Sequence, residues 1–153
     1  MSGGALGFLG LRALVMAELN SANNKLSSRE QRDLDIEIQF LEGVVRRDRR
    51  YVEALQLLGD DYTRRGRFKD GLQVDRRLAR LCPEDPLVHY NLACSFSLTE
   101  EFRKAAHALR KALQSGYRDF EHLRRDSDLE PLRQTNLYAA IEQEIAELEA
   151  ETD

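Results

Sequence analysis

The sequence predicts an all-α protein, and three observations support this prediction. Leu, Ala, Glu, Arg and Gln dominate the 153 residues, and these residue types favour helices over strands. Only three prolines and nine glycines interrupt the chain, so helix-breaking residues are sparse. Sliding the sequence along itself by thirty-four residues aligns positions of similar size, which indicates an internal repeat of two helices.

Composition and cysteine content limit the class of protein further. With 42% hydrophobic and 33% charged residues, the chain can form one soluble domain with a continuous core. Residues 5–19 are apolar, but Arg12 lies inside this run and no basic leader or cleavage site accompanies it, so neither a signal peptide nor a membrane span is expected. Cys82 and Cys94 cannot build a disulfide framework, which favours a reducing, cytoplasmic location.

The N-terminal third is predicted to contain one irregular and one regular element. Residues 1–27 are expected to form an apolar docking helix followed by a loop, whose role is left open. Residues 28–47 are predicted to be a helix, the second half of a degenerate repeat that covers 28–51. The apolar face of this helix consists of Leu34, Ile38, Leu41 and Val45. Two overlapping capping boxes are candidates for its start, Ser27 with Glu30 and Ser28 with Gln31.

Two complete repeats are predicted at 52–85 and 86–118. The thirty-four-residue shift pairs Leu58 with Leu92, Gly59 with Ala93, Tyr62 with Phe96, Phe68 with Phe102, Gly71 with Ala105, Leu78 with Ala112 and Ala79 with Leu113. Small residues let two antiparallel helices approach closely, and large residues fill the space on either side. Pro83 ends the first unit, and Asp85 with Pro86 begins the next. The helices are expected at 52–65, 68–81, 86–98 and 101–115.

These packing positions resemble two consecutive tetratricopeptide-repeat (TPR) motifs between Val52 and Tyr117. Leu55 and His89 replace the usual Trp, and Tyr117 replaces the usual Pro. The resemblance implies a right-handed α-solenoid of antiparallel helix pairs, in which the first helix of each unit lines a concave groove.

The last part of the chain, 119–153, is predicted to cap the array. Asp126, Asp128, Leu129, Leu132 and Arg133 form a D-x-D-L-x-x-L-R pattern, which resembles a segment that often follows TPR arrays in bacterial proteins. A final helix is expected at 137–150, where the apolar stripe Leu137, Ile141, Ile145 and Leu148 can cover the last unit.

No constellation of residues predicts catalysis, a cofactor or a metal. Cys82, His89 and Cys94 lie close in sequence, but their spacing directs them to different sides of a helix rather than to one zinc ion. The early glycines lack the Lys and Ser or Thr of a phosphate-binding loop. The chain is therefore expected not to be an enzyme.

Charge is separated along the chain. Residues 46–80 contain eleven Lys and Arg against six Asp and Glu, whereas 81–153 contain eight against fifteen. The run Arg46 to Arg50 could neutralise phosphates, but the protein is acidic overall and only Tyr51 accompanies the run as a stacking aromatic. No nucleic acid is therefore expected, a solvated turn between repeats or contact with an acidic partner is favoured, and whether this run has a ligand is left open.

The resemblance places eight side chains in the partner-binding groove: Gln56, Asp60, Thr63, Arg64, Tyr90, Asn91, Cys94 and Ser97. For Tyr90 and Cys94, partial burial against the degenerate first unit or the C-terminal helix is an equal alternative. Asp60 would repel a carboxylate tail, which excludes the chaperone-tail clamp known in some TPR proteins. The expected function is a non-catalytic adaptor or scaffold that binds a protein or peptide, with a homo-oligomerisation module as the alternative. A nucleic-acid binder or an enzyme is less favoured.

Overall fold

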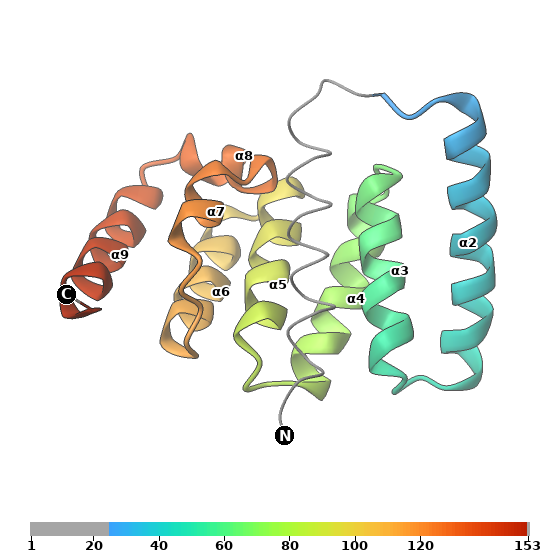
Figure 1. Cartoon of the computed structure of the whole chain (residues 1–153), viewed down its shortest axis with the longest axis horizontal. Coiled ribbons are helices and arrows are strands. Elements are labelled where there is room, and N and C mark those ends of the chain that lie inside the picture. The colour runs from blue at the N-terminus through green and yellow to red at the C-terminus, as the bar shows by residue number, and fades with distance from the viewer. Residues whose placement is uncertain (1–24, 153) are drawn as a thin grey trace.

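The computed structural model describes residues 25–152, and their helices lie in a row from α2 at one end to α9 at the other (Figure 1). The helices are α2 (Ser28–Arg47), α3 (Val52–Arg64), α4 (Phe68–Leu81), α5 (Pro86–Leu98), α6 (Phe102–Gln114), α7 (Phe120–Arg125), the 3₁₀ turn η1 (Ser127–Leu129), α8 (Glu130–Arg133) and α9 (Tyr138–Thr152). No strand occurs within this range, which confirms the all-α prediction. Nearly all of the predicted docking helix and loop, 1–27, lies outside the described residues.

The helix boundaries follow the local sequence signals. At the start of α2, the Ser27 hydroxyl accepts a hydrogen bond from the Glu30 amide, and the Glu30 carboxylate accepts one from the Ser27 amide. This reciprocal pair is a capping box, so the first of the two candidate boxes is the one formed. At the start of α5, the Asp85 carboxylate caps the amides of Leu87 and Val88.

The turns inside the two repeats have different residues in the left-handed conformation. Gly66 follows α3 with φ of 79°, a left-handed conformation that glycine adopts without steric cost. Glu100 occupies the same place after α5 with φ of 61°. Because Glu100 has a Cβ atom, this second turn stores backbone strain.

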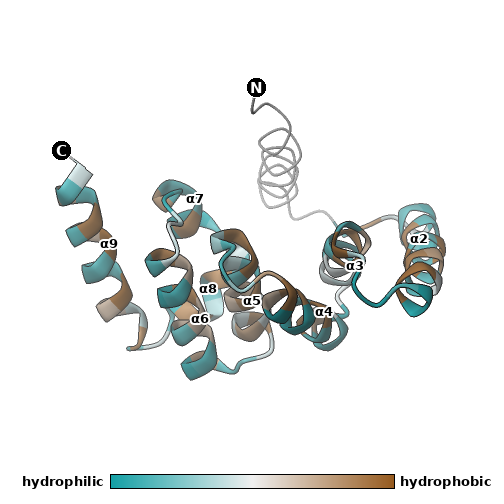
Figure 2. Ribbon diagram, turned by 90° about the horizontal axis from the view of Figure 1, so that it is seen from below, coloured by the Kyte–Doolittle hydropathy of each residue, from teal (hydrophilic) through white to brown (hydrophobic). Residues whose placement is uncertain are grey.

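Each helix from α2 to α5 packs against the next one in the chain, and in Figure 2 the row runs across the view with α2, α3 and α4 seen nearly along their axes. Gly59 lies where α3 meets α4: a Cβ atom added there would lie 3.3 Å from Asp75 Oδ1 and 3.4 Å from Val74 Cγ1. Ala93, at the same position of the second unit, is fully buried. The small residues that the repeat pattern singled out therefore do lie where helices meet.

One buried polar contact joins the first unit to the second. The Ser95 hydroxyl on α5 donates a hydrogen bond of 2.5 Å to Asp75 Oδ2 on α4, and both side chains are almost completely buried. Such a contact fixes the register of α4 against α5, because an unpaired carboxylate here would be costly.

The C-terminal helix α9 packs on α6 with Ile141 and Ile145 fully buried. An ion pair of 2.6 Å between Arg110 and Glu144 joins the two helices at their edge. The predicted final helix, 137–150, is confirmed, with its observed bounds shifted by one and two residues. Sequence reasoning did not predict α7 and α8, which are short and fold around the D-x-D-L-x-x-L-R segment.

Candidate partner-binding face

The predicted groove residues divide into two sets, one on α3 and one on α5. The α5 set does not line an open groove, because the chain's own segment 126–132 lies on it. Tyr90 is 2% exposed, and its hydroxyl donates a 2.6 Å hydrogen bond to Asp126 Oδ2. Cys94 is also buried, with its sulfur 3.7 Å from the same oxygen. Both residues are buried, but by the segment 126–132 and not by the degenerate first unit or the C-terminal helix, the two parts of the chain considered for them.

Ser97 holds the backbone of that segment directly. Its side chain is fully buried, and its hydroxyl oxygen accepts a 3.1 Å hydrogen bond from the Leu132 amide. Leu129 and Leu132 are fully buried beside it. The outer face of α5 thus binds a stretch of polypeptide made of the turn η1 and the short helix α8, through a side-chain contact to main chain and through buried leucines. Asn91, the fourth predicted residue of this helix, stays partly exposed.

Asp126 is the centre of a buried polar cluster between α5 and α7. Besides Tyr90, it receives the Asp128 amide at 3.0 Å, and His122 Nε2 lies 3.3 Å from its carboxylate. Burial alone would raise the pKa of Asp126, but the hydrogen bonds from His122 and Tyr90 lower it below its usual value. The hydrogen bond to Asp126 in turn raises the pKa of His122. The Tyr90 ring stacks on the Tyr117 ring at 4.3 Å, which closes the cluster.

Arg133 fastens the same segment from the other side. Its guanidinium donates to the Leu123 carbonyl at 2.9 Å and to the Asp126 carbonyl. In the D-x-D-L-x-x-L-R pattern, the side chains of Asp126 and Arg133 therefore hydrogen-bond backbone groups of the turn, and the two leucines are buried beneath it. The pattern has a structural role, which is to hold a segment of chain on α5.

The side chains of the α3 set are at least partly exposed, although one carboxylate oxygen of Asp60 is buried. Gln56, Asp60 and Thr63 are partly exposed and Arg64 is exposed, and their spacing places them on one side of the helix. Leu57 lies beside them and is 39% exposed. Among the described elements α3 packs against α2 and α4, and no counterpart of the 126–132 segment lies on this outer face.

A buried carboxylate borders this face. Asp61 is 5% exposed, and its nearest counter-charge is Arg64, 3.7 Å from Oδ1. Its Oδ2 atom has no hydrogen-bond partner within the described chain. Burial and the nearby charge of Glu37 raise the pKa of Asp61 to about 6. A carboxyl group that is buried without a donor favours a ligand that brings one, such as a peptide amide.

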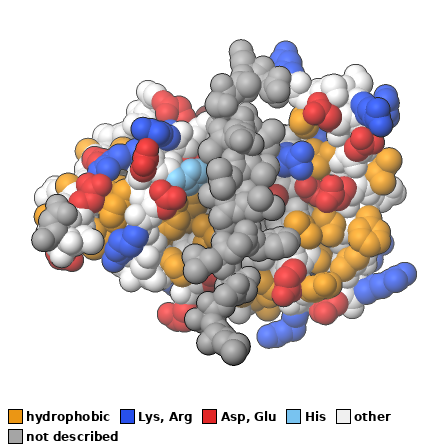
Figure 3. Space-filling model, viewed as in Figure 1, with side chains coloured by type: hydrophobic (Ala, Val, Ile, Leu, Met, Phe, Trp, Pro, Cys, Tyr) orange, Lys and Arg blue, Asp and Glu red, His pale blue; other side chains and the backbone are white. Residues whose placement is uncertain are grey.

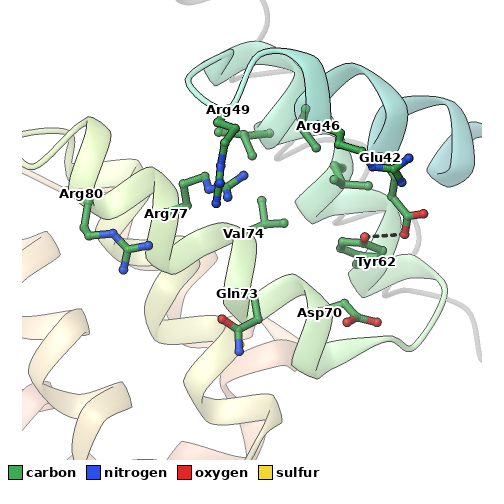
Figure 4. Close-up of a pocket in the computed structure, with 12 residues that line it drawn as sticks. Glu42, Arg46, Arg49, Tyr62, Asp70, Gln73, Val74, Arg77 and Arg80 are labelled. Atoms are coloured by element: carbon green, nitrogen blue, oxygen red, sulfur yellow. Dashed lines mark hydrogen bonds between the residues drawn. The ribbon is translucent and has the colours of Figure 1, made fainter.

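A separate pocket lies between α2 and α4, and sequence reasoning did not assemble it (Figure 4). It has a volume of about 440 Å³ and combines arginine side chains with an apolar floor. Arg46 and Arg49 belong to the basic run that the sequence singled out, whereas Gln73, Arg77 and Arg80 come from α4. The last three occur at positions i, i+4 and i+7 on one face of a helix, and that spacing was the signal that could have found them.

The described residues hold no cluster of His, Cys, Asp and Glu that could bind a metal ion. His89 Nε2 lies 2.6 Å from the Pro83 carbonyl oxygen, and the Cys94 sulfur contacts Asp126. Two of the three residues considered as a zinc site therefore have partners within the chain. Neither Cys82 nor Cys94 forms a disulfide within the described chain. None of the described helices combines the length and the apolar character that crossing a membrane requires.

Comparison with known proteins gives a partial similarity. Eighty residues, about 50% of this chain, are 34% identical to a chloroplastic protein from Arabidopsis thaliana. The aligned region spans 24% of the length of that protein, so the similarity concerns a segment of it. No family model matches the chain.

Proposed function

We propose that this chain is a non-catalytic protein-interaction module, an adaptor or scaffold, that binds a segment of a partner protein along the outer face of α3. The observation that carries the proposal is the 126–132 segment on α5. There the corresponding face of the second unit binds a stretch of polypeptide, with Ser97 contacting its main chain. A surface that holds one segment of chain in this way is suited to hold another.

The thirty-four-residue shift relates the two faces residue by residue. It places Gln56 at the position of Tyr90, Asp60 at that of Cys94, and Thr63 at that of Ser97. On α3 these positions have hydrogen-bonding side chains that stay accessible, with Leu57 as an apolar contact next to them. We further propose that the helix pairs form a right-handed, TPR-like solenoid, an arrangement that presents such faces side by side.

Affinity chromatography with matched variants tests the proposal. The immobilised chain carrying Leu57→Asp and Gln56→Ala should retain its helical circular dichroism, because both side chains are at least partly exposed. This double variant should no longer capture proteins that the unaltered chain captures. Gln114→Ala, on an exposed residue at the end of α6, is the control and should capture as the unaltered chain does. Equal capture by both variants would refute binding at α3.

Self-association is a second candidate function, and exposed apolar side chains on α2 favour it. Ile36 is 66% exposed and Phe40 is 69% exposed, one helical turn apart on the same side. Figure 3 shows hydrophobic side chains gathered over α2 and α3 on the face turned to the viewer. Sedimentation at low and high salt tests this candidate: Phe40→Glu should convert a dimer to a monomer if α2 is the interface. A monomer at all concentrations in the unaltered chain would exclude it.

Location in the cell remains a prediction. The name of the plant relative assigns that protein to the chloroplast, whereas the two cysteines of this chain fit any reducing compartment. Cell fractionation would test the expected cytoplasmic location.

A further inference from the structure

Four arginines line the pocket between α2 and α4. Arg46 and Arg49 come from the end of α2 and the turn after it, and Arg77 and Arg80 come from α4. Figure 4 shows the side chains of Arg49 and Arg77 pointing toward one another. In residues 25–152, none of these four guanidinium groups forms a hydrogen bond or an ion pair. Like charges at close range repel, so an anion placed between them would be stabilised.

The two acidic residues of the pocket do not supply that anion. Glu42 accepts a 2.6 Å hydrogen bond from the Tyr62 hydroxyl and lies 3.6 Å from Arg67. Asp70 accepts a 2.8 Å hydrogen bond from Arg67. Figure 4 shows both acids at the end near Tyr62, whereas Arg49, Arg77 and Arg80 lie at the other end. The arginine end therefore keeps its positive charge.

The floor of the pocket is apolar and limits the kind of anion. Val45, Val74, Leu55 and Leu58 line it, within a volume of about 440 Å³. A ligand made only of phosphates would leave this floor without a partner, and the net charge of −4 disfavours a long polyanion such as RNA. A peptide with carboxylates on one side of an aliphatic side chain matches the arginine end and the floor together.

We propose that this pocket binds an acidic segment of a partner protein, with Arg49, Arg77 and Arg80 contacting carboxylates and an aliphatic side chain resting on Val45 and Val74. The site is independent of the proposed binding at the outer face of α3. Leu55, Leu58 and Tyr62, the pocket residues of α3, lie on the opposite side of that helix from Gln56 and its neighbours. One module would thus offer two surfaces for two different segments.

Fluorescence anisotropy with a designed peptide tests the proposal. The probe is a short fluorescein-labelled peptide in which a run of Glu and Asp follows a Leu-Leu pair, and a dissociation constant of about ten micromolar is expected for a contact of this size. Arg77→Gln together with Arg80→Gln should weaken binding about tenfold. Gln73→Glu, which adds an acid at the mouth of the pocket, should also weaken it. Circular dichroism and melting temperature verify that each variant folds.

Matched controls separate the pocket from general charge attraction. Arg47→Gln with Arg50→Gln removes the same charge from exposed arginines of the same basic region that do not line the pocket. This control should change binding by less than about twofold. Equal loss with both arginine pairs would overturn the proposal, as would equal binding of a probe with Ser-Ser in place of Leu-Leu. Tighter binding of single-stranded RNA or of anionic lipid vesicles than of the peptide would overturn the assignment to an acidic protein segment.

Discussion

Replacing Tyr90 with Phe tests whether the Asp126 cluster holds the C-terminal segment on α5. The substitution removes a single hydroxyl, which donates a 2.6 Å hydrogen bond to a carboxylate that is only 6% exposed. The ring remains, so its stacking on Tyr117 is retained. The remaining donors to Asp126 are the Asp128 amide, His122 and the Cys94 thiol. The Asp126 carboxylate therefore keeps some of its hydrogen-bond donors in the variant.

The expected loss follows from that geometry. A buried hydrogen bond to a charged group contributes about 1.5 to 3 kcal/mol, so Tyr90→Phe should lower the free energy of unfolding by about 2 kcal/mol. In a chain of this size, that corresponds to a melting temperature lower by about 4 to 8 °C. Tyr138→Phe is the matched control, because its hydroxyl donates a longer bond of 3.2 Å to the partly exposed Glu142. This control substitution should lower the free energy of unfolding by less than about 1 kcal/mol.

Thermal denaturation and amide hydrogen exchange measure the two consequences. The Leu132 amide, which donates to Ser97, should exchange faster in Tyr90→Phe, while amides of α3 and α4 keep their protection. Equal destabilisation by Tyr90→Phe and Tyr138→Phe would refute the reasoning. Unchanged exchange at Leu132 would show that the cluster does not hold the segment.

Four further predictions concern stability. The pKa of His122 is raised in the folded state, so the protonated imidazole stabilises the fold. This stabilisation is complete below the unfolded pKa of 6.5 and is lost as pH rises through the folded pKa. Urea unfolding from pH 5 to 9 should therefore show a fall in the free energy of unfolding, and His122→Gln should remove this fall. The pKa of Asp61 is raised to about 6 in the folded state, so Asp61→Asn should stabilise the fold by about 1 to 3 kcal/mol at pH 8. At pH 3, below the pKa of Asp61 in both the folded and the unfolded state, the substitution should leave the stability unchanged. Equal stability of the two proteins at pH 8 would contradict this. Glu100→Gly should relieve the left-handed strain and stabilise by about 0.5 to 1 kcal/mol, as a denaturant midpoint would show. Gly59→Leu should destabilise the fold by about 1 to 3 kcal/mol or more, because the larger side chain overpacks the contact between α3 and α4. Gly43→Ala should stabilise the fold, because a Cβ atom added there meets nothing within 4 Å. Equal melting temperatures of the two variants would contradict the assigned packing.

Sequence reasoning located most helices because local and repeat signals agree. The helices α2, α4 and α5 begin and end at the residues expected, where capping groups and prolines coincide with apolar periodicity. The segment between α6 and α9 was harder to predict, because α7 and α8 have only six and four residues. Helices this short depend on tertiary packing, and periodicity cannot be read over so few positions.

The candidate site was only partly predictable for a different reason. A repeat pattern identifies which side chains of α3 and α5 face outward, but it does not reveal what covers them. Ser97 and Tyr90 have the polar character of groove residues, and the same character lets them bind the chain's own backbone and Asp126. The arginine pocket was missed because its two halves lie about thirty residues apart in the sequence, and only the packing of α2 and α4 beside α3 brings Arg49 and Arg77 together.

Site-specific photo-crosslinking measures partner binding at α3 most directly. A photoreactive amino acid at Gln56, on the outer face of α3, should form crosslinks in cells to a recurrent segment of another protein, identified by mass spectrometry. The same amino acid at Gln114, on α6, should not yield that segment. If Gln56 and Gln114 give the same products, or if Gln56 crosslinks only within its own chain, α3 is not a partner-binding face.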